Sequence, residues 1–323
     1  MLSVVLCTYN GARYLPAQLK SIMAQTRPVD EIVIQDDGST DGTVQICQDF
    51  ADKHPGLVRF FVNQGKPLGP SKNFYSAMAK AQGNLLALCD QDDLWEPDKL
   101  RLQEAALQTS GKLLCTCRSK PFAEDGAEAY YDARRPNYTL MRMLHCAEIP
   151  GHTILMRREL LELLPKDVAI LSHRMYDIVL SVVAAAGERI AVVDQVLVHQ
   201  RRYTQAATYT SIDGQRATAT NARKILFWCL KHYGTIKRLG AEGYLDWAEL
   251  LRALPYRTKR TADAICLMEL QSRSGFLNYL LTARLCLRYR YEICHTPGRG
   301  LAAIVRAIFF PLTSLWYKRG LIM

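Results

Sequence analysis

The chain has 323 residues, of which 49% are hydrophobic and 22% are charged. This composition excludes a largely disordered protein and predicts one large globular domain, or one domain with an appendage. The formal net charge is +10, but residues 201–323 carry it, with 20 Lys and Arg against 7 Asp and Glu, whereas residues 1–200 hold 21 against 24.

The basic C-terminal third fits nucleic acid, an anionic membrane surface or a phosphate-bearing ligand. We do not expect nucleic acid, because the sequence has no zinc-finger spacing, no run of Lys and Arg and no aromatic pattern for single strands. The ten cysteines are irregularly spaced without a Cys-x-x-Cys pair, and no signal peptide is recognisable, so a reducing cytosol is expected. No apolar run reaches the roughly 18 residues of a membrane span.

The first hundred residues alternate between two apolar periods. Short continuous apolar runs are typical of buried strands, and Leu15, Leu19 and Ile22 fall at helical spacing between the first two. This alternation predicts an α/β fold whose mostly parallel sheet is covered by helices. The predicted strands are residues 3–7, 31–35, 57–62 and 85–89, and a helix is predicted over 73–81.

Polar residues follow each predicted strand. In parallel α/β sheets the carboxyl ends of the strands meet at one edge, and ligands bind outside that edge. We therefore expect a ligand site there. The segments that follow the strands are Thr8-Tyr9-Asn10, Asp36-Asp37-Gly38-Ser39, Asn63-Gln64-Gly65 and Asp90-Gln91-Asp92-Asp93.

The first acidic segment combines a turn with two adjacent carboxylates. Ser39, Thr40 and Asp41 are accounted for by a turn and a helix cap. Asp36 and Asp37 repel each other, and no turn requires both. A carboxylate at this position can accept hydrogen bonds from a nucleobase or a ribose.

The second acidic segment places three carboxylates within the four residues 90–93. Such density raises their pKa values unless a cation neutralises them. Mg²⁺ and Mn²⁺ take oxygen ligands and often complete their shell with substrate phosphates. A solvated acidic loop is the alternative, but the Leu94-Trp95 that follows indicates a constrained loop, so we favour a divalent metal site.

Residues 113–200 are less regular. Residues 149–156 and 190–198 are predicted to be strands, and a helix beginning near Ser172 carries Asp177. Taken alone, Asp177 is more typical of a surface residue, although a carboxylate can also serve as a general base. Arg201 could bind a diphosphate or lie in a solvated basic loop. His152 and His199 fit metal ligation less well than a structural or acceptor-side role.

The C-terminal third reads as helical from about residue 215. Residues 221–240, 277–287 and 301–317 each combine an apolar stripe with basic residues. A helical bundle that packs on the predicted α/β domain explains the apolar stripes. The basic charge favours peripheral contact with an anionic membrane, and Pro311 is expected to break the last helix and so to oppose a true span.

The strand-end motifs together resemble family 2 glycosyltransferases, and in particular their rhamnosyltransferase-like bacterial branch. The resemblance is dense over residues 1–102 and thinner over 145–205. It implies a GT-A fold over residues 1–212 followed by a helical region over 213–323. It also implies a nucleoside-diphosphate sugar donor (dTDP-rhamnose or a UDP-sugar), inversion at the anomeric carbon, and a cell-surface glycan or polyprenyl-linked saccharide as acceptor. The segments that carry it are residues 3–10, Gln25-Thr26, residues 36–41, residues 90–95 and Lys99-Leu100.

The resemblance also implies roles for individual residues. Asp177 is the expected catalytic base, and Asp92, with Asp90, is expected to bind Mg²⁺ or Mn²⁺. Gly151, His152 and Trp95 are expected on the acceptor side. The expected donor contacts are Thr8, Tyr9, Asp37, Lys72, Asp90 and Arg201.

Two residues depart from the family pattern. Tyr203 stands where relatives often carry a metal-assisting His, and Tyr176 precedes the expected base in place of the commoner Glu or His. Two other functions stay open: a nucleotide-sugar processing enzyme and a non-catalytic, membrane-associated nucleotide-sugar-binding module. The first would need a Gly-rich phosphate loop with a Lys near the first strand, and residues 7–11 match this poorly.

Overall fold

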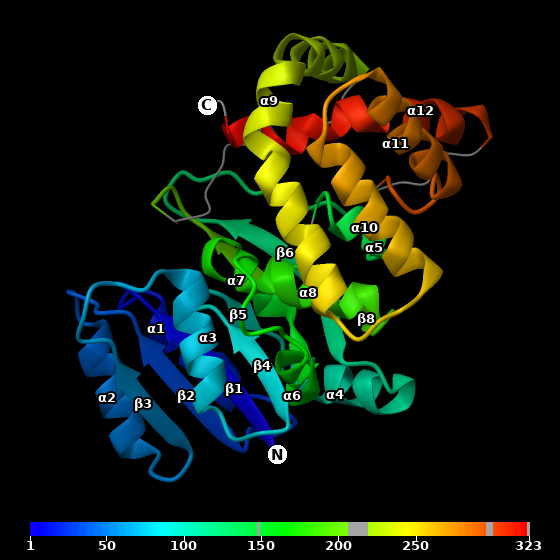
Figure 1. Ribbon diagram of the computed structural model, residues 1–323. Coiled ribbons are helices and arrows are strands. Elements are labelled where there is room, and N and C mark those ends of the chain that lie inside the picture. The colour runs from blue at the N-terminus through cyan, green and yellow to red at the C-terminus, as the bar shows by residue number, and fades with distance from the viewer. Residues whose placement is uncertain (147–148, 206–218, 295–299, 322–323) are drawn as a thin grey trace.

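The computed structural model describes residues 1–146, 149–205, 219–294 and 300–321. Its centre is an eight-stranded mixed sheet with helices on both faces, and a helical C-terminal region stands over one end (Figure 1). The strands are β1 (Leu2–Thr8), β2 (Glu31–Asp36), β3 (Val58–Val62), β4 (Leu85–Cys89), β5 (Leu94–Trp95), β6 (Leu114–Ala123), β7 (Leu155–Arg157) and β8 (Ile190–Arg202).

The strand order is β3-β2-β1-β4-β7-β6-β8-β5. The four predicted N-terminal strands run parallel to one another, so the expected parallel half is confirmed. The other half is mixed, because β7 runs antiparallel to β4 and β6, and β5 runs antiparallel to β8. Since β1, β2 and β4 are parallel, the loops at their carboxyl ends share one edge.

Helices cover the sheet on both faces because β1 is apolar on both. Val5 and Cys7 belong to the core cluster that contains residues of α3 and α8, whereas Val4 and Leu6 belong to the cluster that contains residues of α1, α2 and α4. This alternation is the two-residue period of a strand. The helices of residues 1–205 are α1 (Leu15–Met23), α2 (Thr43–Lys53), α3 (Pro70–Lys80), α4 (Lys99–Ser110), α5 (Leu140–Met143), α6 (Arg158–Glu162), α7 (Ile170–His173) and α8 (Tyr176–Ala186).

Two predicted elements differ from the structure. Most of the strand predicted over residues 149–156 is wrong: Gly151–Thr153 forms the 3₁₀ turn η1, which Thr153 closes by donating to the Pro150 carbonyl from N–H (3.0 Å) and Oγ1 (2.7 Å). The helix that carries Asp177 begins at Tyr176 instead of near Ser172, because Met175 has an extended backbone that separates α7 from α8.

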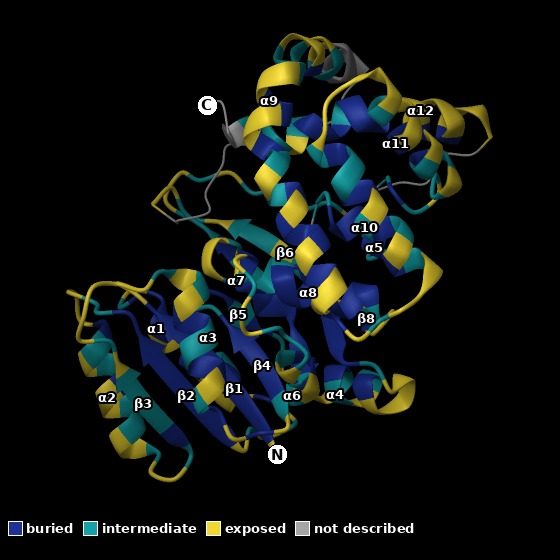
Figure 2. Cartoon of the chain, viewed as in Figure 1, coloured by how far each residue is buried: buried dark blue, intermediate teal, exposed yellow. Residues whose placement is uncertain are grey.

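The C-terminal region is helical, as predicted. Its α9 and α10 continue the core of the sheet, since Trp247 of α9 and Leu267 of α10 belong to the same buried cluster as Val179 of α8. Figure 2 shows buried residues on α8 and on the part of α9 beside it. The expected domain boundary at 212/213 lies outside the described residues. The C-terminal elements are α9 (Ala219–Ala253), α10 (Lys259–Ser272), α11 (Phe276–Arg288), α12 (Leu301–Thr313) and the 3₁₀ helix η3 (Ser314–Leu321).

The last helical segment is longer than expected. Pro311 lies inside α12, which continues to Thr313 before the chain tightens into η3. By length and composition, Leu301–Arg319 could cross a membrane, whereas the sequence had indicated no such segment. Leu312 and Leu315 are buried against α9 residues in a small core cluster, so the second half of the segment packs within the helical bundle.

Candidate active site

Two of the loops at the carboxyl edge of the sheet are joined by one side chain. The Gln91 amide accepts from the Tyr9 backbone N–H (2.9 Å) and donates to the Tyr9 carbonyl (2.9 Å), so it ties the loop after β4 to the loop after β1. A Cβ at Gly11 would lie 2.1 Å from Gln91 Oε1, so a larger residue there would displace the Gln91 amide. Sequence reasoning gave Gln91 no role, because nothing in its neighbours marks it as a bridge.

Asp36 organises the loop after β2. Its buried carboxylate accepts from the Gly38 and Ser39 backbone N–H groups and from the hydroxyls of Thr8 (2.7 Å) and Ser39 (2.6 Å). The Thr8 hydroxyl, expected to contact the donor, is therefore bonded to Asp36 in this structure. Of the adjacent carboxylates Asp36 and Asp37, Asp36 therefore shapes the loop.

Asp37 fixes the segment that leads into α3. Its Oδ1 accepts from Asn63 Nδ2 (3.0 Å) and the Leu68 N–H (2.8 Å), and its Oδ2 accepts from the Gly69 N–H (2.8 Å). A carboxylate has about four lone-pair positions, so Oδ2 keeps one for a ligand. Lys72 lies exposed in the first turn of α3, which begins at Pro70 rather than near Asn73 as predicted.

The loop after β4 and the turn η1 bring a histidine into the acidic cluster. Within the described residues, one group of metal-ligating side chains stands out: Asp90, Asp93 and His152, whose ligand atoms lie within 4.8 Å of one another. His152 Nδ1 lies 3.3 Å from Asp90 Oδ2 and 3.2 Å from Asp93 Oδ2, and its Nε2 lies 2.9 Å from Ser119 Oγ. We call these three residues the acidic–histidine cluster.

Burial and mutual charge shift the pKa values in this cluster. Burial alone would lower the pKa of His152, but the carboxylates of Asp93 and Asp90 outweigh it and raise that pKa to about 9. Burial raises the pKa of Asp93 to about 7, against the opposing charge of His152. Negative charge is therefore costly here without a cation.

Asp92 is bonded to Tyr203 and does not belong to the acidic–histidine cluster. The Tyr203 hydroxyl donates to Asp92 Oδ2 at 2.8 Å, and the Tyr203 ring packs on Tyr14 with centroids 4.9 Å apart. Arg201 holds the same loop from within: its Nε donates to the Asp92 carbonyl (3.0 Å) and its guanidinium pairs with Glu124. The buried guanidinium that was expected to bind a diphosphate is engaged by the protein.

The acidic–histidine cluster fits a divalent cation. Two carboxylates and an imidazole are ligands that Mn²⁺ accepts, and Mg²⁺ favours the carboxylates. Asp93 Oδ2 is buried and accepts no hydrogen bond within the described part of the chain, and its charge faces the His152 ring, whose Nδ1 lies 3.2 Å away. A divalent cation that replaces the proton of His152 would take over this charge. The expected metal pair, Asp90 and Asp92, shares one residue with this cluster.

Asp177 lies in the first turn of α8, on the other side of η1. Its Oδ2 accepts from the Gly151 N–H (3.1 Å) and its Oδ1 from the Ile178 N–H (2.8 Å). Burial raises the pKa of Asp177 to about 6, and the charge of Asp90 adds to this against the two hydrogen bonds. Because His152 follows Gly151, one short turn touches both Asp177 and the acidic–histidine cluster.

Tyr176 explains why glycine occupies position 151. A Cβ on Gly151 would lie 2.0 Å from the Tyr176 hydroxyl oxygen, and the Tyr176 ring stacks on Phe74 with centroids 4.1 Å apart. The residue before the expected base is therefore a buried packing residue that sets the position of the turn.

Trp95 lies in the core. Its side chain is 4% exposed, and Lys99 Nζ lies 4.0 Å from its ring centroid. The Lys99 amine is buried and has no hydrogen-bond partner among the described residues. The expected acceptor-side Trp95 thus supports the acidic loop from below.

His199, the other histidine considered from the sequence, is paired with Glu96: its Nε2 lies 2.6 Å from Glu96 Oε1.

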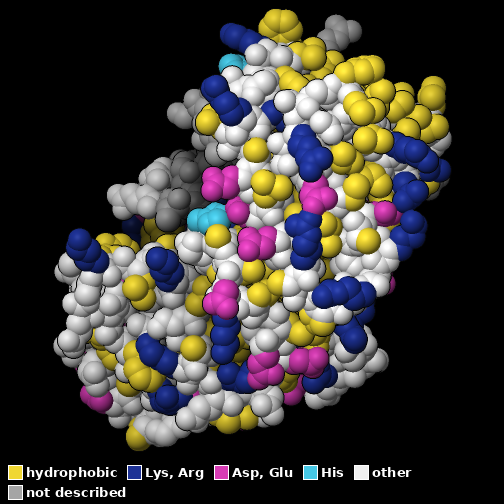
Figure 3. Space-filling model, viewed as in Figure 1, with side chains coloured by type: hydrophobic (Ala, Val, Ile, Leu, Met, Phe, Trp, Pro, Cys, Tyr) yellow, Lys and Arg dark blue, Asp and Glu magenta, His cyan; other side chains and the backbone are white. Residues whose placement is uncertain are grey.

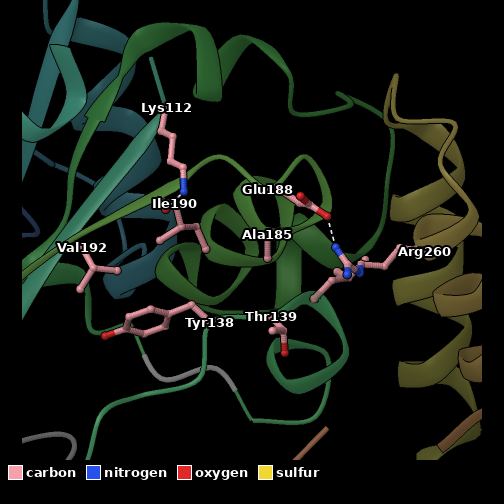
Figure 4. A pocket seen from close by; sticks show the side chains of 9 residues that line it. Lys112, Tyr138, Thr139, Ala185, Glu188, Ile190, Val192 and Arg260 are labelled. Carbon is pink, nitrogen blue, oxygen red and sulfur yellow. Dashed lines mark hydrogen bonds and ion pairs between the residues drawn. The ribbon is translucent and has the colours of Figure 1, made fainter. Parts of the chain in front are cut away.

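A separate cavity of about 350 Å³ shares no residue with the carboxyl edge of the sheet. Glu188 and Arg260 form an ion pair at its border, and Lys112 Nζ donates to the Ile190 carbonyl (2.8 Å), as Figure 4 shows. Its two cations and its acid are thus all engaged by the protein. The chemistry-bearing side chains gather at the carboxyl edge instead.

The family of the chain follows from a sequence match that covers the carboxyl edge of the sheet. Residues 3–164 match the family model described as "Glycosyl transferase family 2". The chain belongs to this family. The match includes the loops after β1, β2 and β4 and the turn η1, so the resemblance noted from the motifs is confirmed. Asp177, Arg201 and Tyr203 lie beyond the matched residues.

Curated members of glycosyl transferase family 2 align with part of the chain. An uncharacterized glycosyltransferase of Nostoc sp. is 38% identical over 111 residues, 34% of this chain and 33% of that protein. The dTDP-rhamnosyl transferase RfbG of Shigella flexneri is 35% identical over 99 residues, 30% of this chain and 34% of that protein. The chain thus spans about a third of these relatives' lengths.

A solved structure covers nearly the whole chain. TarS of S. aureus, in complex with UDP-GlcNAc, superposes with a TM-score of 0.56 at 14% identity, over 99% of this chain and 90% of that one. Such low identity speaks for the fold alone. The expected GT-A-type sheet with a helical C-terminal region is confirmed.

Proposed function

We propose that this family 2 member transfers a sugar, with inversion, from a nucleoside-diphosphate donor to an acceptor hydroxyl. The observation that carries the proposal is the position of Asp177, a carboxylate of raised pKa hydrogen-bonded to the turn that also bears His152 of the acidic–histidine cluster. A base and a cation site are then neighbours, as attack beside a departing diphosphate requires.

The donor is placed along the carboxyl edge of the sheet. Tyr9 is 49% exposed while both its backbone groups are held by Gln91, so its ring offers a face to a nucleobase. Asp37 keeps a lone pair for a base N–H, and Asp90 is assigned to the ribose side. Lys72 in the first turn of α3 adds positive charge for the phosphates.

The metal is assigned to the acidic–histidine cluster, with Asp92 joining when its bond to Tyr203 is released. Bound Mg²⁺ or Mn²⁺ would neutralise the charge that develops on the leaving diphosphate. The protein's own part is to keep this cation site beside the base: Arg201 holds the Asp92 carbonyl and Ser119 contacts His152. Arg201 therefore acts on the donor through the loop.

Asp177 is the proposed base. The acceptor hydroxyl gives its proton to the Asp177 carboxylate as its oxygen bonds to the anomeric carbon and the bond to the diphosphate breaks. The Gly151 N–H orients the carboxylate, and Gly151 with His152 forms the acceptor side. Above its pKa of about 6 the carboxylate is charged and ready to accept the proton.

The donor class follows from relatives as a proposal. RfbG is a dTDP-rhamnosyl transferase and TarS was solved with UDP-GlcNAc, so dTDP-rhamnose and UDP-sugars are the first donors to test. The proposed acceptor is a cell-surface glycan or a polyprenyl-linked saccharide, met at the cytoplasmic face of the plasma membrane. Residues 1–212 would form the catalytic part and 213–323 its basic helical appendage.

A thermal-shift screen of donor nucleotides with and without Mn²⁺, followed by a transfer assay, tests the proposal. We expect stabilisation by one diphosphate sugar only when Mn²⁺ is present. Asp177→Asn should keep this stabilisation and lose turnover, whereas Asp167→Asn, at an exposed carboxylate, should behave as the parent. No response to any nucleotide, or full turnover by Asp177→Asn, contradicts the proposal.

A further inference from the structure

Helices α11 and α12 present a continuous apolar surface (Figure 3), where hydrophobic side chains gather with Lys and Arg beside them. Six large side chains define this surface, which we call the α11–α12 face, and they are 44–79% exposed. They are Phe276, Leu277 and Leu280 of α11 and Leu301, Val305 and Phe309 of α12.

The opposite sides of both helices are already used for packing. Cys286 of α11 and Ala307 and Phe310 of α12 are buried in the same core as the sheet. The Tyr279 hydroxyl donates to the Ile308 carbonyl (2.9 Å) and so joins the two helices. The α11–α12 face is therefore an outer side on a fixed scaffold, and its Val305 and Phe309 border a cavity of about 490 Å³ beside Ile225 of α9.

The charge around this face is of one sign. Neither helix contains Asp or Glu, whereas α11 carries Arg284 and Arg288 and α12 carries Arg306. Arg288 is paired with Asp263 of α10. Arg273 and Arg284 are exposed beside the apolar side chains. A second copy of the chain docked on this face would bring these like charges together, whereas anionic lipid headgroups complement them.

We infer that the α11–α12 face inserts into the interface of an anionic phospholipid bilayer, with its arginines at the headgroups. Helices that lie in this interface combine a large apolar face with basic flanks. The inference deepens the proposed function and rests on it in one respect, that the acceptor is membrane-bound. Since Leu312 and Leu315 pack against α9, the segment lies along the membrane rather than across it.

Co-sedimentation with vesicles tests this inference on the full chain. We expect binding to phosphatidylglycerol–phosphatidylcholine vesicles that weakens with salt, and little binding to phosphatidylcholine alone. Phe276→Ser with Phe309→Ser should reduce vesicle affinity at least about tenfold, because each loses a large buried apolar area in the interface. Arg273→Gln with Arg284→Gln should weaken binding about fivefold per charge.

Met23→Ser is the matched control, since Met23 is 42% exposed at the end of α1, outside this face. Unchanged thermal melts of all variants would show that they fold. Equal vesicle binding by the Phe276/Phe309 variant and the parent overturns the inference. So does a parent that ignores vesicles but dimerises through this face. Because donor and acceptor are absent from the assay, and transfer to a water-soluble acceptor is measured separately, the inference and the proposed function can fail independently.

Discussion

Asp177 makes the proposed chemistry dependent on pH. Its pKa is raised to about 6. As the pH falls through 6, the carboxylate becomes protonated and can no longer act as a base. We expect kcat to drop about tenfold per pH unit below 6 and to level off above, in a rate profile at saturating donor and Mn²⁺.

Asp177→Asn controls this profile. Its residual rate should be lower by at least about a hundredfold and should lack the step near pH 6. A variant whose profile keeps the same step would assign that step to another group, with the neighbouring cluster as the first candidate.

Asp36 provides a stability test at the same edge. Four donors bond to its buried carboxylate, so Asp36→Ala leaves buried N–H and hydroxyl groups without partners. We expect a loss of about 2–4 kcal/mol in the free energy of unfolding, measured by urea denaturation. Asp49→Ala, which removes an exposed i,i+4 bond to Gln45 on α2, should change it by less than about 0.5 kcal/mol. Equal losses would contradict the role of Asp36.

At the scale of elements, the turn η1 couples the packing of Tyr176 to the position of the proposed base. Gly151→Ala must move η1 or Tyr176, because the new Cβ would lie 2.0 Å from the Tyr176 hydroxyl oxygen and 2.7 Å from its Cζ. The Gly151 N–H bond to Asp177 shifts with it. We therefore expect kcat to fall at least tenfold in the transfer assay, with donor affinity changed less.

Gly234→Ala in α9 is the control for this change. Nothing lies within 4 Å of the added Cβ there, so helix propensity should raise stability by up to about 1 kcal/mol. If Gly151→Ala were as harmless as this, the turn would not position the base.

The parallel half of the sheet could be predicted because each of its strands is one apolar run directly followed by polar residues. The other half lacks so regular a pattern. Strands β6 and β8 join Leu114 to Ile190, and β7 has only three residues, so no local period marks either pairing. The 3₁₀ turn at Gly151 was missed for a related reason, since its apolar neighbours imitate a strand.

The candidate site was predictable in outline and not in its contacts. The edge of the sheet follows from the positions of Asp37, Asp90 and Asp177 after strands or at a helix start. Whether a carboxylate is open or already bonded depends on distant partners. Tyr203, 111 residues beyond Asp92 in the chain, is bonded to that carboxylate, and no spacing rule reveals it.

At the scale of the whole molecule, the C-terminal helices and the sheet share one core. Trp247 of α9 is 5% exposed in the cluster that includes residues of β1 and α8. Trp247→Ala should lower the free energy of unfolding by about 3–5 kcal/mol. Circular dichroism and fluorescence should still report a single coincident unfolding transition.

Leu245→Ala, at a 48% exposed position on the same helix, should leave the unfolding midpoint nearly unchanged. Two separate transitions in the parent would show instead that the helical region unfolds independently of the sheet. The described packing of α9 and α10 argues for one cooperative unit.

The buried amine of Lys99 beneath the acidic loop has a chemical consequence. Burial lowers its pKa, and no hydrogen bond holds it within the described structure, so only the Trp95 ring and the surrounding core shield it. Acetic anhydride would modify exposed lysines such as Lys72 within the native protein and spare Lys99 until the core around β5 opens. The extent of acetylation at Lys99 over time, measured by mass spectrometry, would therefore report how fast the core beneath the acidic loop opens.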